Sequence, residues 1–335
     1  MACLIFVVSQ FGSMRMQMCA QESTFTVVEL NVENLFDTTH DTLKNDWEFL
    51  PESSHHWTRS RYWTKLRRIG KTILSCGMEN VGHDGSEVLC LPDLVGLCEV
   101  ENDTCIRDLT KRSLLRNARY EYVMTDSPDE RGIDVALLYS PFSFKMLSWK
   151  ALRVVPSQGM KPTRDILYVS GELLTGDTLH VFVLHAPSRA QGVRETNRFR
   201  LQVMKCMCMA IDSIRKVNGS VKILAMGDFN DGADAASLHY VYGYDMVNVS
   251  ENTKGRHGAC GTYRYQGEWG SLDHILVSRN LLPFVKDCRI HDAPFLLEED
   301  EKYGGVKPRR NYLGPRYNDG YSDHLPLVLR LEWQK

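Results

Sequence analysis

Short apolar segments recur along the chain from Phe25 to Leu331, and polar loops separate them. Many of these segments are continuous apolar runs or alternate with period two, which is typical of β-strands. Eight segments have this pattern: Thr26–Asn31, Leu94–Glu99, Asp134–Tyr139, Leu167–Glu172, His180–His185, Lys222–Gly227, Leu272–Val277 and Pro326–Leu331. Apolar positions three and four residues apart predict helices over 60–76, Cys105–Arg116 and 194–215.

Several of the predicted strands are apolar on both faces, which suits sheets that are covered on both sides by a second sheet or by helices. We therefore expect an α/β fold built as a sandwich of two sheets. The 335 residues would allow two domains at roughly 100–200 residues each, but no Pro/Ser-rich linker or repeat divides the chain. A single domain over residues 24–335 is expected, with long insertions at 38–92 and 289–322.

The composition indicates a folded body with a large core. Hydrophobic residues make up 43% and charged residues 24% of the chain, which disfavours a disordered, fibrous or polytopic membrane protein. The formal net charge is only −2, so the overall field does not attract a polyanion. Any surface that binds phosphate must therefore be local, and nothing in the sequence implies a protein partner.

Ten cysteines are present, and several lie in or beside apolar runs. Small thiols in such positions are commonly buried, so free thiols are favoured over a disulfide framework, although both stay open. No CxxC motif pairs with a second CxxC or with HxxxH, so a structural zinc site has little support.

Residues 1–20 have some features of a signal peptide. The apolar run Ala2–Val8 is too short to span a membrane, and Ala20 could be the last residue before cleavage. The segment lacks a basic residue before the apolar run, and Arg15 interrupts the approach to the cleavage site. We expect export, either periplasmic or secreted, with a misassigned start on a cytoplasmic protein as the alternative. No membrane insertion is expected.

Polar residues that can bind a metal or a phosphate lie at the ends of the predicted core strands. A carboxylate in such a place is costly unless it is paired or bound to a metal. The residues are Asn31, Glu99, His185, Asp228 with Asn230, Asp273, and Asp323 with His324. Each alone could be a turn residue, a cap or part of a surface ion pair. Together they supply hard oxygen ligands and two imidazoles, the groups needed for metal-assisted phosphoester hydrolysis.

Seven motifs follow one another in the order LNVENL, GLCEVEN, RGIDVALLY, LHAPSR, MGDFND, SLDHIL and YSDHLPL. The chain thereby resembles the endonuclease/exonuclease/phosphatase superfamily, which includes pancreatic-type deoxyribonuclease, abasic-site endonucleases, inositol-polyphosphate 5-phosphatases and bacterial sphingomyelinases. The resemblance covers residues 25–331. It implies a four-layered α/β sandwich of two packed mixed sheets flanked by helices, with the metal site at one edge.

The resemblance implies a Mg²⁺ site, with Mn²⁺ as a possible replacement. Glu99 matches the principal metal carboxylate of the family, Asn31 the neighbouring amide, and Asp323 completes the set. A sparse set of protein oxygens suits Mg²⁺, because this ion keeps several of its waters. Many members carry Gln-Glu where this chain has Cys98-Glu99, which spares the ligand but can alter substrate contacts.

The resemblance also implies catalytic roles. Asp228 and Asn230 match the pair that orients and activates the attacking water. His324, held by Asp273, is expected to donate to a phosphate oxygen or to move a proton. His185 is expected to be a general acid for the leaving oxygen, with Asp134 as a weaker candidate for its partner.

Three further residues are expected on the substrate side. Arg164 matches an arginine that deoxyribonuclease-like members direct at phosphate, and the alternative for it is a surface salt bridge with Asp165 or another acid. Asn34 and Ser188 are weaker candidates for substrate contacts.

Two segments combine basic and aromatic residues, His55–Lys71 and Tyr303–Tyr321. Such segments suit a nucleic-acid strand, with charge for the backbone and rings for the bases; an amphipathic helix and a solvated loop are the alternative. The block GTYRYQGEWGSLDHI resembles exported bacterial nucleases. We therefore expect an endonuclease acting on DNA or RNA, with a phosphatase or phosphodiesterase of small phosphoesters or phospholipid headgroups, or a non-catalytic binding protein, as alternatives.

Overall fold

A computed structural model describes residues 23–78, 80–81, 87–88, 90–190 and 192–333. The possible signal peptide at residues 1–20 lies outside the described residues. Two six-stranded sheets form the body, with strand orders β15-β20-β1-β4-β6-β5 and β11-β14-β10-β9-β8-β7. The bounds in the first sheet are β1 Ser23–Leu35, β4 Leu94–Val100, β5 Glu121–Met124, β6 Asp134–Tyr139, β15 Val285–Ile290 and β20 Leu327–Trp333. Those in the second are β7 Phe144–Leu152, β8 Ile166–Leu173, β9 Thr178–His185, β10 Lys222–Asp228, β11 Met246–Asn248 and β14 Asp273–Ser278.

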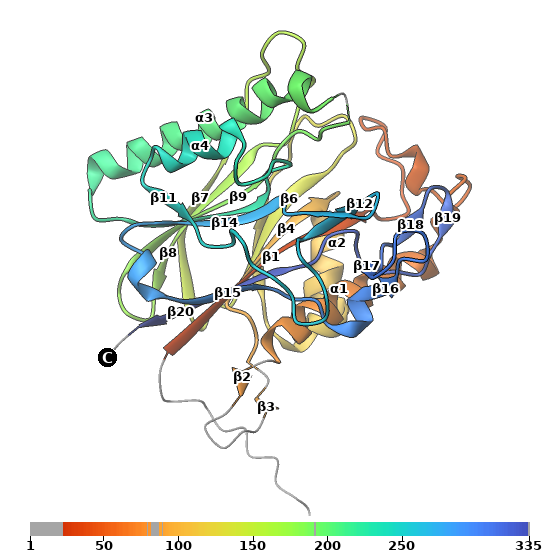
Figure 1. Ribbon diagram of the computed structural model, residues 1–335, viewed down its shortest axis with the longest axis horizontal. Coiled ribbons are helices and arrows are strands. Elements are labelled where there is room, and N and C mark those ends of the chain that lie inside the picture. The colour runs from red at the N-terminus through yellow and green to blue at the C-terminus, as the bar shows by residue number, and fades with distance from the viewer. Residues whose placement is uncertain (1–22, 79, 82–86, 89, 191, 334–335) are drawn as a thin grey trace, which may run out of the picture.

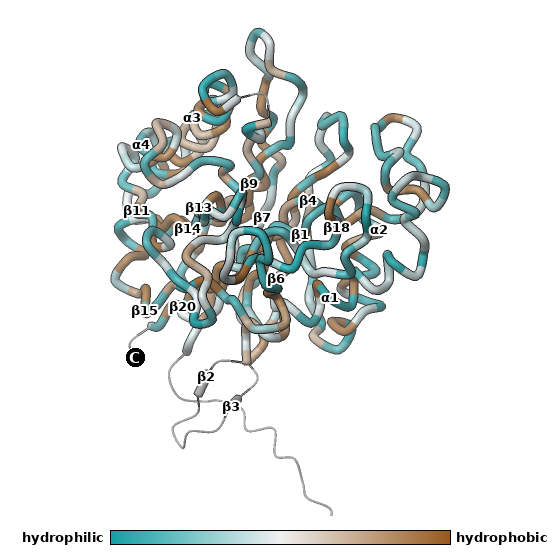
Figure 2. The backbone as a smooth tube through the Cα atoms, turned by 45° about the vertical axis from the view of Figure 1, so that its right-hand side comes forward, coloured by the Kyte–Doolittle hydropathy of each residue, from teal (hydrophilic) through white to brown (hydrophobic). Residues whose placement is uncertain are grey.

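Three apolar clusters separate four layers, which confirms the expected sandwich. The central cluster fills the space between the sheets and includes Val27, Val183 and Ile275. The outer face of the first sheet packs against α1 (Arg59–Gly77) and α2 (Asp103–Arg107), and that of the second packs against α3 (Val193–Val217) and α4 (Ala236–Tyr242). Figure 1 shows these helices on opposite sides of the two sheets, and Figure 2 shows apolar stretches running through the central strands.

All eight expected strands are present, but four further strands of the two sheets escaped the sequence analysis. These are β5, β7, β11 and β15, and each of them lies at an edge of its sheet. An edge strand is only partly covered, so its apolar alternation is weak. In β7, for example, most residues are exposed or half-buried.

The helix expected over Cys105–Arg116 is wrong in its continuity. It is divided into α2, a π-helical turn at Asp108–Arg112 and a 3-10 helix at Leu114–Asn117. Ser113 has an extended backbone, and its side chain accepts a hydrogen bond from the Leu115 N–H at 3.2 Å. A serine in this position caps a new helix instead of continuing the previous one.

The two long insertions contain α1, the 3-10 helices Trp47–Phe49 and Pro294–Leu296, and short two-stranded ribbons. The ribbons pair β2 (Asn80–Val81) with β3 (Glu87–Val88), β16 (Leu297–Glu299) with β17 (Val306–Pro308), and β18 (Tyr312–Leu313) with β19 (Arg316–Tyr317), while β12 (Tyr263–Tyr265) pairs with β13 (Glu268–Gly270) elsewhere in the chain.

The two basic-aromatic segments contact each other. The Lys65 Nζ donates to the Tyr321 carbonyl at 2.7 Å, and the Arg61 guanidinium lies 4.2 Å from the centre of the Tyr317 ring. Arg68 pairs with Asp319 at 2.5 Å. Many of the cations that suggested a nucleic-acid surface therefore contact other parts of the protein. This agrees better with the alternative of an ordinary amphipathic helix and a loop.

Among the described residues, no helix is both long and apolar enough to cross a membrane. Cys98, Cys105 and Cys208 are buried free thiols, as the sequence favoured.

Candidate active site

Strand alternation brings the polar strand ends together. Side chains two residues apart lie on the same face of a strand, and Val27, Val183, Met226 and Ile275 all face the central core. By the same alternation Asn31, His185, Asp228 and Asp273 face the space between the sheets. They lie at one end of the sandwich, because β9 and β10 run parallel and end there, whereas β14 runs antiparallel and begins there.

Glu99 reaches the site through an irregularity in β4. Leu97 belongs to the outer cluster and Cys98 to the central one, so regular alternation would turn Glu99 outward. The pairing of β4 with β6 shifts between Cys98 and Val100, and Glu99 has a φ of 66°. A bulge with a left-handed residue re-aims a side chain in this way. The Glu99 Oε2 accepts a hydrogen bond from the Asn34 N–H at 2.9 Å.

His324 and Asp273 form the expected pair. The Nδ1 of His324 is 2.7 Å from the Oδ2 of Asp273, and both side chains are buried. Burial alone would lower the pKa of His324, but the carboxylates of Asp273 and Asp228 outweigh it and raise that pKa well above its usual value. His324 is therefore an imidazolium at neutral pH. Its ring packs against the Tyr263 ring with centroids 4.9 Å apart.

Asp228 is at the centre of the site. Its Oδ2 accepts from the Asn31 Nδ2 at 3.1 Å, and its Oδ1 accepts from the Asn230 N–H at 2.8 Å. Burial, followed by the charge of Asp273, raises the pKa of Asp228 to about 7. A carboxyl group with such a pKa can exchange a proton near neutral pH. Asp228, Asp273 and His324 lie close enough together to hold a metal ion.

Asn230 lies in the turn that follows β10. It has a φ of 51°, a conformation that asparagine tolerates better than most residues. Its Nδ2 donates to the Ala186 carbonyl at 3.0 Å, and its own carbonyl accepts from the Arg189 Nε at 2.7 Å. These contacts hold the amide beside Asp228.

His185 lies beside two carboxylates of the site. Its Nε2 is 3.6 Å from the Asp228 Oδ2 and 3.9 Å from the Glu99 Oε1. Burial, followed by the positive charges of Arg164 and Arg131, lowers its pKa well below the usual value. A lowered pKa favours the neutral ring, which can donate a hydrogen bond, and the general-acid role stays a prediction.

The expected pairing of Asp134 with His185 is wrong. Asp134 accepts hydrogen bonds from the side chains of Thr125 and Ser127, and from the Ser127 N–H at 3.1 Å. The Nδ1 of His185 is buried and has no hydrogen-bond partner. The Asp134 carboxyl group therefore fastens the 125–127 segment to β6 and does not orient the imidazole.

Arg164 lines the cleft, but most of its hydrogen-bonding groups are engaged. Its Nη1 pairs with the buried Asp129 at 3.0 Å, its Nε donates to the His185 carbonyl, and its Nη2 donates to the Ala186 carbonyl at 2.7 Å. Arg164 thus has an ion pair with another acid, as the alternative expected, but the pair with Asp129 is buried and does not lie at the surface. Arg164 fixes the end of β9 and supplies positive charge, without a side chain free to move onto a phosphate.

The remaining expected residues lie on the rim. The Asp323 Oδ2 accepts from the Arg310 Nη2 at 3.0 Å. Ser188 is exposed and lines the cleft. The Asn34 Oδ1 accepts from the Arg131 Nη2 at 2.5 Å, so Asn34 supports Glu99 and Arg131 from one side.

A cleft of about 1040 Å³ opens above these residues. Its lining contains Glu99, Asp228, Asn230, Asp323 and His324, so the site residues share one solvent space. Aromatic and cationic side chains also line this cleft: Tyr263, Tyr265, Trp269, Arg131, Lys161 and Arg189.

Arg131 is the residue that the sequence analysis missed most plainly. It precedes Asp134 in the quoted motif RGIDVALLY, so the signal was present but was assigned to the acid. Its side chain is 48% exposed, and its Nη1 is 3.9 Å from the Glu99 Oε1. Unlike Arg164, it retains a partly exposed guanidinium beside the principal carboxylate.

Glu29 was also missed, because it lies inside a predicted strand and not at its end. It is fully buried, and neither carboxylate oxygen has a hydrogen-bond partner. Burial, followed by the charges of Asp273 and Asp228, raises its pKa well above the usual value. A charged residue at an inward-facing position of β1 is the signal that could have revealed it.

The residues present fit a hard divalent cation. The Glu99 Oε1 has only contacts of 3.9 Å, to Arg131 and His185, and the Asp273 Oδ1 is buried without a hydrogen-bond partner. Carboxylate oxygens that lack donors are the ligands that Mg²⁺ and Mn²⁺ prefer. Asp323 adds a carboxylate to the lining of the cleft, while the Asn31 Oδ1 accepts from the Glu33 N–H at 3.0 Å.

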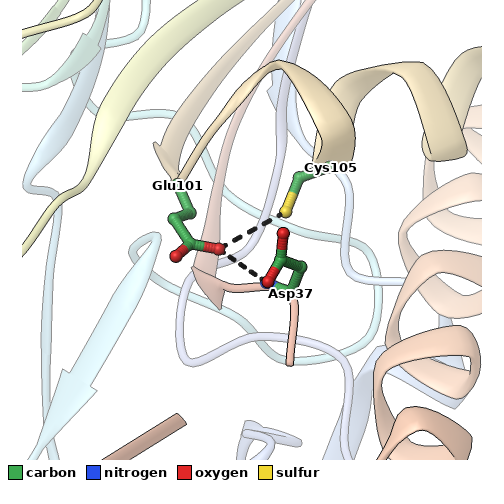
Figure 3. A group of neighbouring side chains, drawn as sticks. All are labelled: Asp37, Glu101 and Cys105. Atoms are coloured by element: carbon green, nitrogen blue, oxygen red, sulfur yellow. Dashed lines mark hydrogen bonds between the residues drawn. The ribbon is translucent and has the colours of Figure 1, made fainter. Parts of the chain in front are cut away.

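A second group that could hold a metal, Asp37, Glu101 and Cys105, lies away from this cleft. Figure 3 shows that one Glu101 oxygen accepts from the Asp37 backbone N–H at 2.7 Å and from the Cys105 Sγ at 3.8 Å. Burial raises the pKa of Glu101 to about 8. A protonated carboxyl group and these hydrogen bonds account for the cluster without a cation.

Comparisons with known proteins agree with this geometry. The sequence matches the model of the Endonuclease/Exonuclease/phosphatase family over residues 26–333. A search of curated proteins found no match.

Several solved structures share the fold. A mannosyl-6-phosphatase from Bacteroides thetaiotaomicron has a TM-score of 0.59 and 17% identity, covering 92% of this chain and 100% of that chain. The catalytic domain of human nocturnin, with bound sulfate, has a TM-score of 0.55 and 17% identity over 92% of this chain and 93% of that chain. Truncated TDP2 from Caenorhabditis elegans has a TM-score of 0.55 and 14% identity over 93% and 98%.

Proposed function

Because the chain belongs to the endonuclease/exonuclease/phosphatase family, whose members hydrolyse phosphoesters, it is a phosphoesterase, and we propose that it hydrolyses phosphodiester bonds of DNA or RNA. The observation that carries the proposal is the cleft, whose lining combines stackable rings and cations with the catalytic carboxylates. Rings can stack on bases and cations can contact the phosphates of a strand. A small phosphomonoester would need less of this surface.

Members of the family typically depend on a divalent metal ion, and we propose Mg²⁺ here, with Mn²⁺ as a substitute. Glu99, Asn31 and Asp323 would hold it. The cation would supply positive charge to the phosphate oxygens as negative charge develops on them.

The chain's own residues orient the reacting groups. Asp228, with a pKa of about 7, accepts a proton from the attacking water, and the Asn230 amide holds that water or the phosphate. The His324 imidazolium donates a hydrogen bond to a non-bridging phosphate oxygen, because Asp273 keeps it charged. Preorganised donors of this kind stabilise the transition state without reorganisation. His185 contributes a neutral N–H donor on the other side of Asp228.

A small phosphoester is the second candidate. The structural neighbour that is a mannosyl-6-phosphatase covers 92% of this chain, and the same catalytic residues would serve a sugar phosphate. The open cleft admits both substrates, so the discrimination has to come from a direct assay.

The experiment is a substrate panel with purified protein. Plasmid DNA, an RNA oligomer, bis-p-nitrophenyl phosphate and mannose 6-phosphate are each incubated with Mg²⁺, Mn²⁺ or EDTA, with His324→Gln as the inactive control. Metal-dependent cleavage of DNA or RNA that the variant lacks supports the proposal. Turnover confined to the sugar phosphate would contradict it.

A further inference from the structure

A second cleft of about 680 Å³ adjoins the active site. Its lining includes Glu33 and Asn34 at the end of β1, Phe49 and His55 from the insertion, and Tyr312 from β18. Arg131 and Asn45 line both clefts. The two spaces therefore meet at these residues, close to the Glu99 carboxylate.

The division between the clefts is a fixed contact between two loops. The Lys44 Nζ donates to the Ser127 carbonyl at 2.6 Å and to the Asp129 carbonyl at 3.1 Å. The Asn45 N–H donates to the Glu130 carbonyl at 2.7 Å. Gly132 has a φ of 79°, which a larger residue would adopt only with strain, and a Cβ there would make a tight contact of 3.0 Å with the Lys44 side chain. Arg131 is thus held at the division.

The wall of the second cleft is rich in rings. Phe36 and Phe49 stack with centroids 4.1 Å apart, and His55 and Tyr312 stack at 4.5 Å. Of these four rings, Phe49 and His55 are partly exposed, whereas Phe36 and Tyr312 are buried behind them. Such a wall favours a flat, apolar-faced group over a sugar, which offers no π-face.

Polar side chains in the same cleft can donate hydrogen bonds to the edge of a bound ligand's ring. Arg310 is 39% exposed and is fixed by Asp323 at 3.0 Å and by Glu33 at 3.6 Å. The two backbone hydrogen bonds that Glu33 accepts, from Asn311 at 2.6 Å and Tyr312 at 3.3 Å, immobilise this pair. Arg131 supplies a second cation at the side that faces the active site.

We propose that the second cleft binds a nucleoside directly attached to the scissile phosphate, while Arg131 contacts that phosphate at the division. The inference rests on the proposed nuclease function and deepens it: the substrate is a phosphodiester, with one nucleoside in each cleft. The volume suits the ligand, since sites for small molecules commonly occupy about 300–1000 Å³. In this arrangement the partly exposed Arg131, and not Arg164, is the arginine that contacts the phosphate.

The test fills the second cleft from its rim. Ser54 is exposed and lines this cleft only, so Ser54→Trp should occupy it without disturbing the core. The matched control is Thr42→Trp, an exposed residue of the same insertion that lines neither cleft. Thermal unfolding verifies that both variants are folded, and Glu48→Trp is a second filling variant.

The readout compares two substrates and one inhibitor. For Ser54→Trp, kcat/KM on a ten-nucleotide oligomer should fall at least tenfold more than kcat/KM on methyl p-nitrophenyl phosphate. Inhibition of the small ester by adenosine 5′-monophosphate should weaken at least tenfold. Thr42→Trp should match the wild type in both. Equal losses on both substrates, or no loss in either filling variant, would overturn the inference.

Failure of the proposed function has a different signature. If the wild type hydrolyses the small ester but no nucleic acid, the nuclease proposal fails. The nucleoside site is then judged by adenosine 5′-monophosphate alone, from inhibition or from calorimetry with Mn²⁺. Binding that Ser54→Trp weakens keeps the site, and binding that it leaves unchanged removes it.

Discussion

His185 and His324 are both buried beside Asp228, with exposed fractions of 4% and 7%, yet their pKa values move in opposite directions. His324 has the Asp273 carboxylate 2.7 Å from its Nδ1. The Nδ1 of His185 has no hydrogen-bond partner, and the nearby Arg164 and Arg131 add positive charge. Burial lowers the pKa of both rings, so the neighbouring charges decide the difference.

The two histidines therefore differ in what they can offer to a phosphate. The His324 side of the site holds a positive charge in place before the substrate arrives. The His185 side supplies a neutral donor, and its positive charge comes from arginines that cannot lose a proton. In the proposed mechanism a phosphate between them would meet cations on both sides, but only one of these is a histidine whose charge depends on Asp273.

The largest effect is expected from His324→Gln, which removes the charged donor. We expect kcat to fall at least about 100-fold, since positioned acid and base groups typically contribute 10²–10⁴-fold. Steady-state assays at saturating Mg²⁺ measure it, with circular dichroism as the control for folding. A loss below tenfold would mean that His324 has no part in the chemistry.

Asp273→Asn should have the next largest effect and should change the pH profile. The imidazolium form of His324 is present below its pKa, and Asp273 is the main group that raises this pKa. Without the carboxylate the pKa falls, so activity on the alkaline side should be lost at a lower pH. At pH 8 we expect about a tenfold loss that partly recovers near pH 6. If the activity of Asp273→Asn fell at the same alkaline pH as that of the wild type, Asp273 would not be the group that raises the pKa of His324.

His185→Gln should cost less, about tenfold or below, because glutamine can replace a neutral N–H donor. The pH dependence of kcat should keep its shape, since the wild-type ring does not titrate near neutral pH. Loss of one limb of a bell-shaped profile would instead restore His185 as the general acid that the sequence suggested.

Glu29→Gln should change activity least, within about threefold, but should raise stability at neutral pH. The pKa of Glu29 is raised in the folded protein, so folding is favoured when the carboxyl group is protonated. The folded state therefore loses stability as the pH rises above the pKa that Glu29 has in the unfolded chain. In EDTA the variant should melt at least about 2 °C above the wild type at pH 7, roughly the effect of 1 kcal/mol in a large domain. At pH 4 the melting temperatures should converge. A lower melting temperature for the variant at pH 7 would contradict the buried, unpaired carboxylate.

Much of the site follows from the sequence, because strand alternation and polar strand ends are local properties. Asn31, Asp228 and Asp273 meet for this reason. Glu99 meets them for another, since its bulge breaks the alternation, and only the resemblance to a family identified its role.

The parts that escaped prediction depend on contacts between distant segments. Arg164 lies just before β8, and its ion pair is with Asp129, 35 residues earlier in the chain. The carboxyl group of Asp134 accepts hydrogen bonds from a loop that precedes β6. The edge strands carry weak patterns because solvent covers part of them. Export stays a prediction, and sequencing the N-terminus of the mature protein would test cleavage after Ala20.

The irregularity at Glu99 makes the length of β4, and not only its composition, part of the site. Deleting one residue between Leu94 and Cys98 would turn the inward-facing side chains outward, and the outward-facing ones inward, in the part of β4 before the deletion. Most deletions in loops leave the faces of the strands unchanged. A scan of single-residue deletions should therefore find β4 far less tolerant than the insertion loops. Anyone transplanting this site into another sandwich would have to copy the backbone at Glu99 together with its side chain.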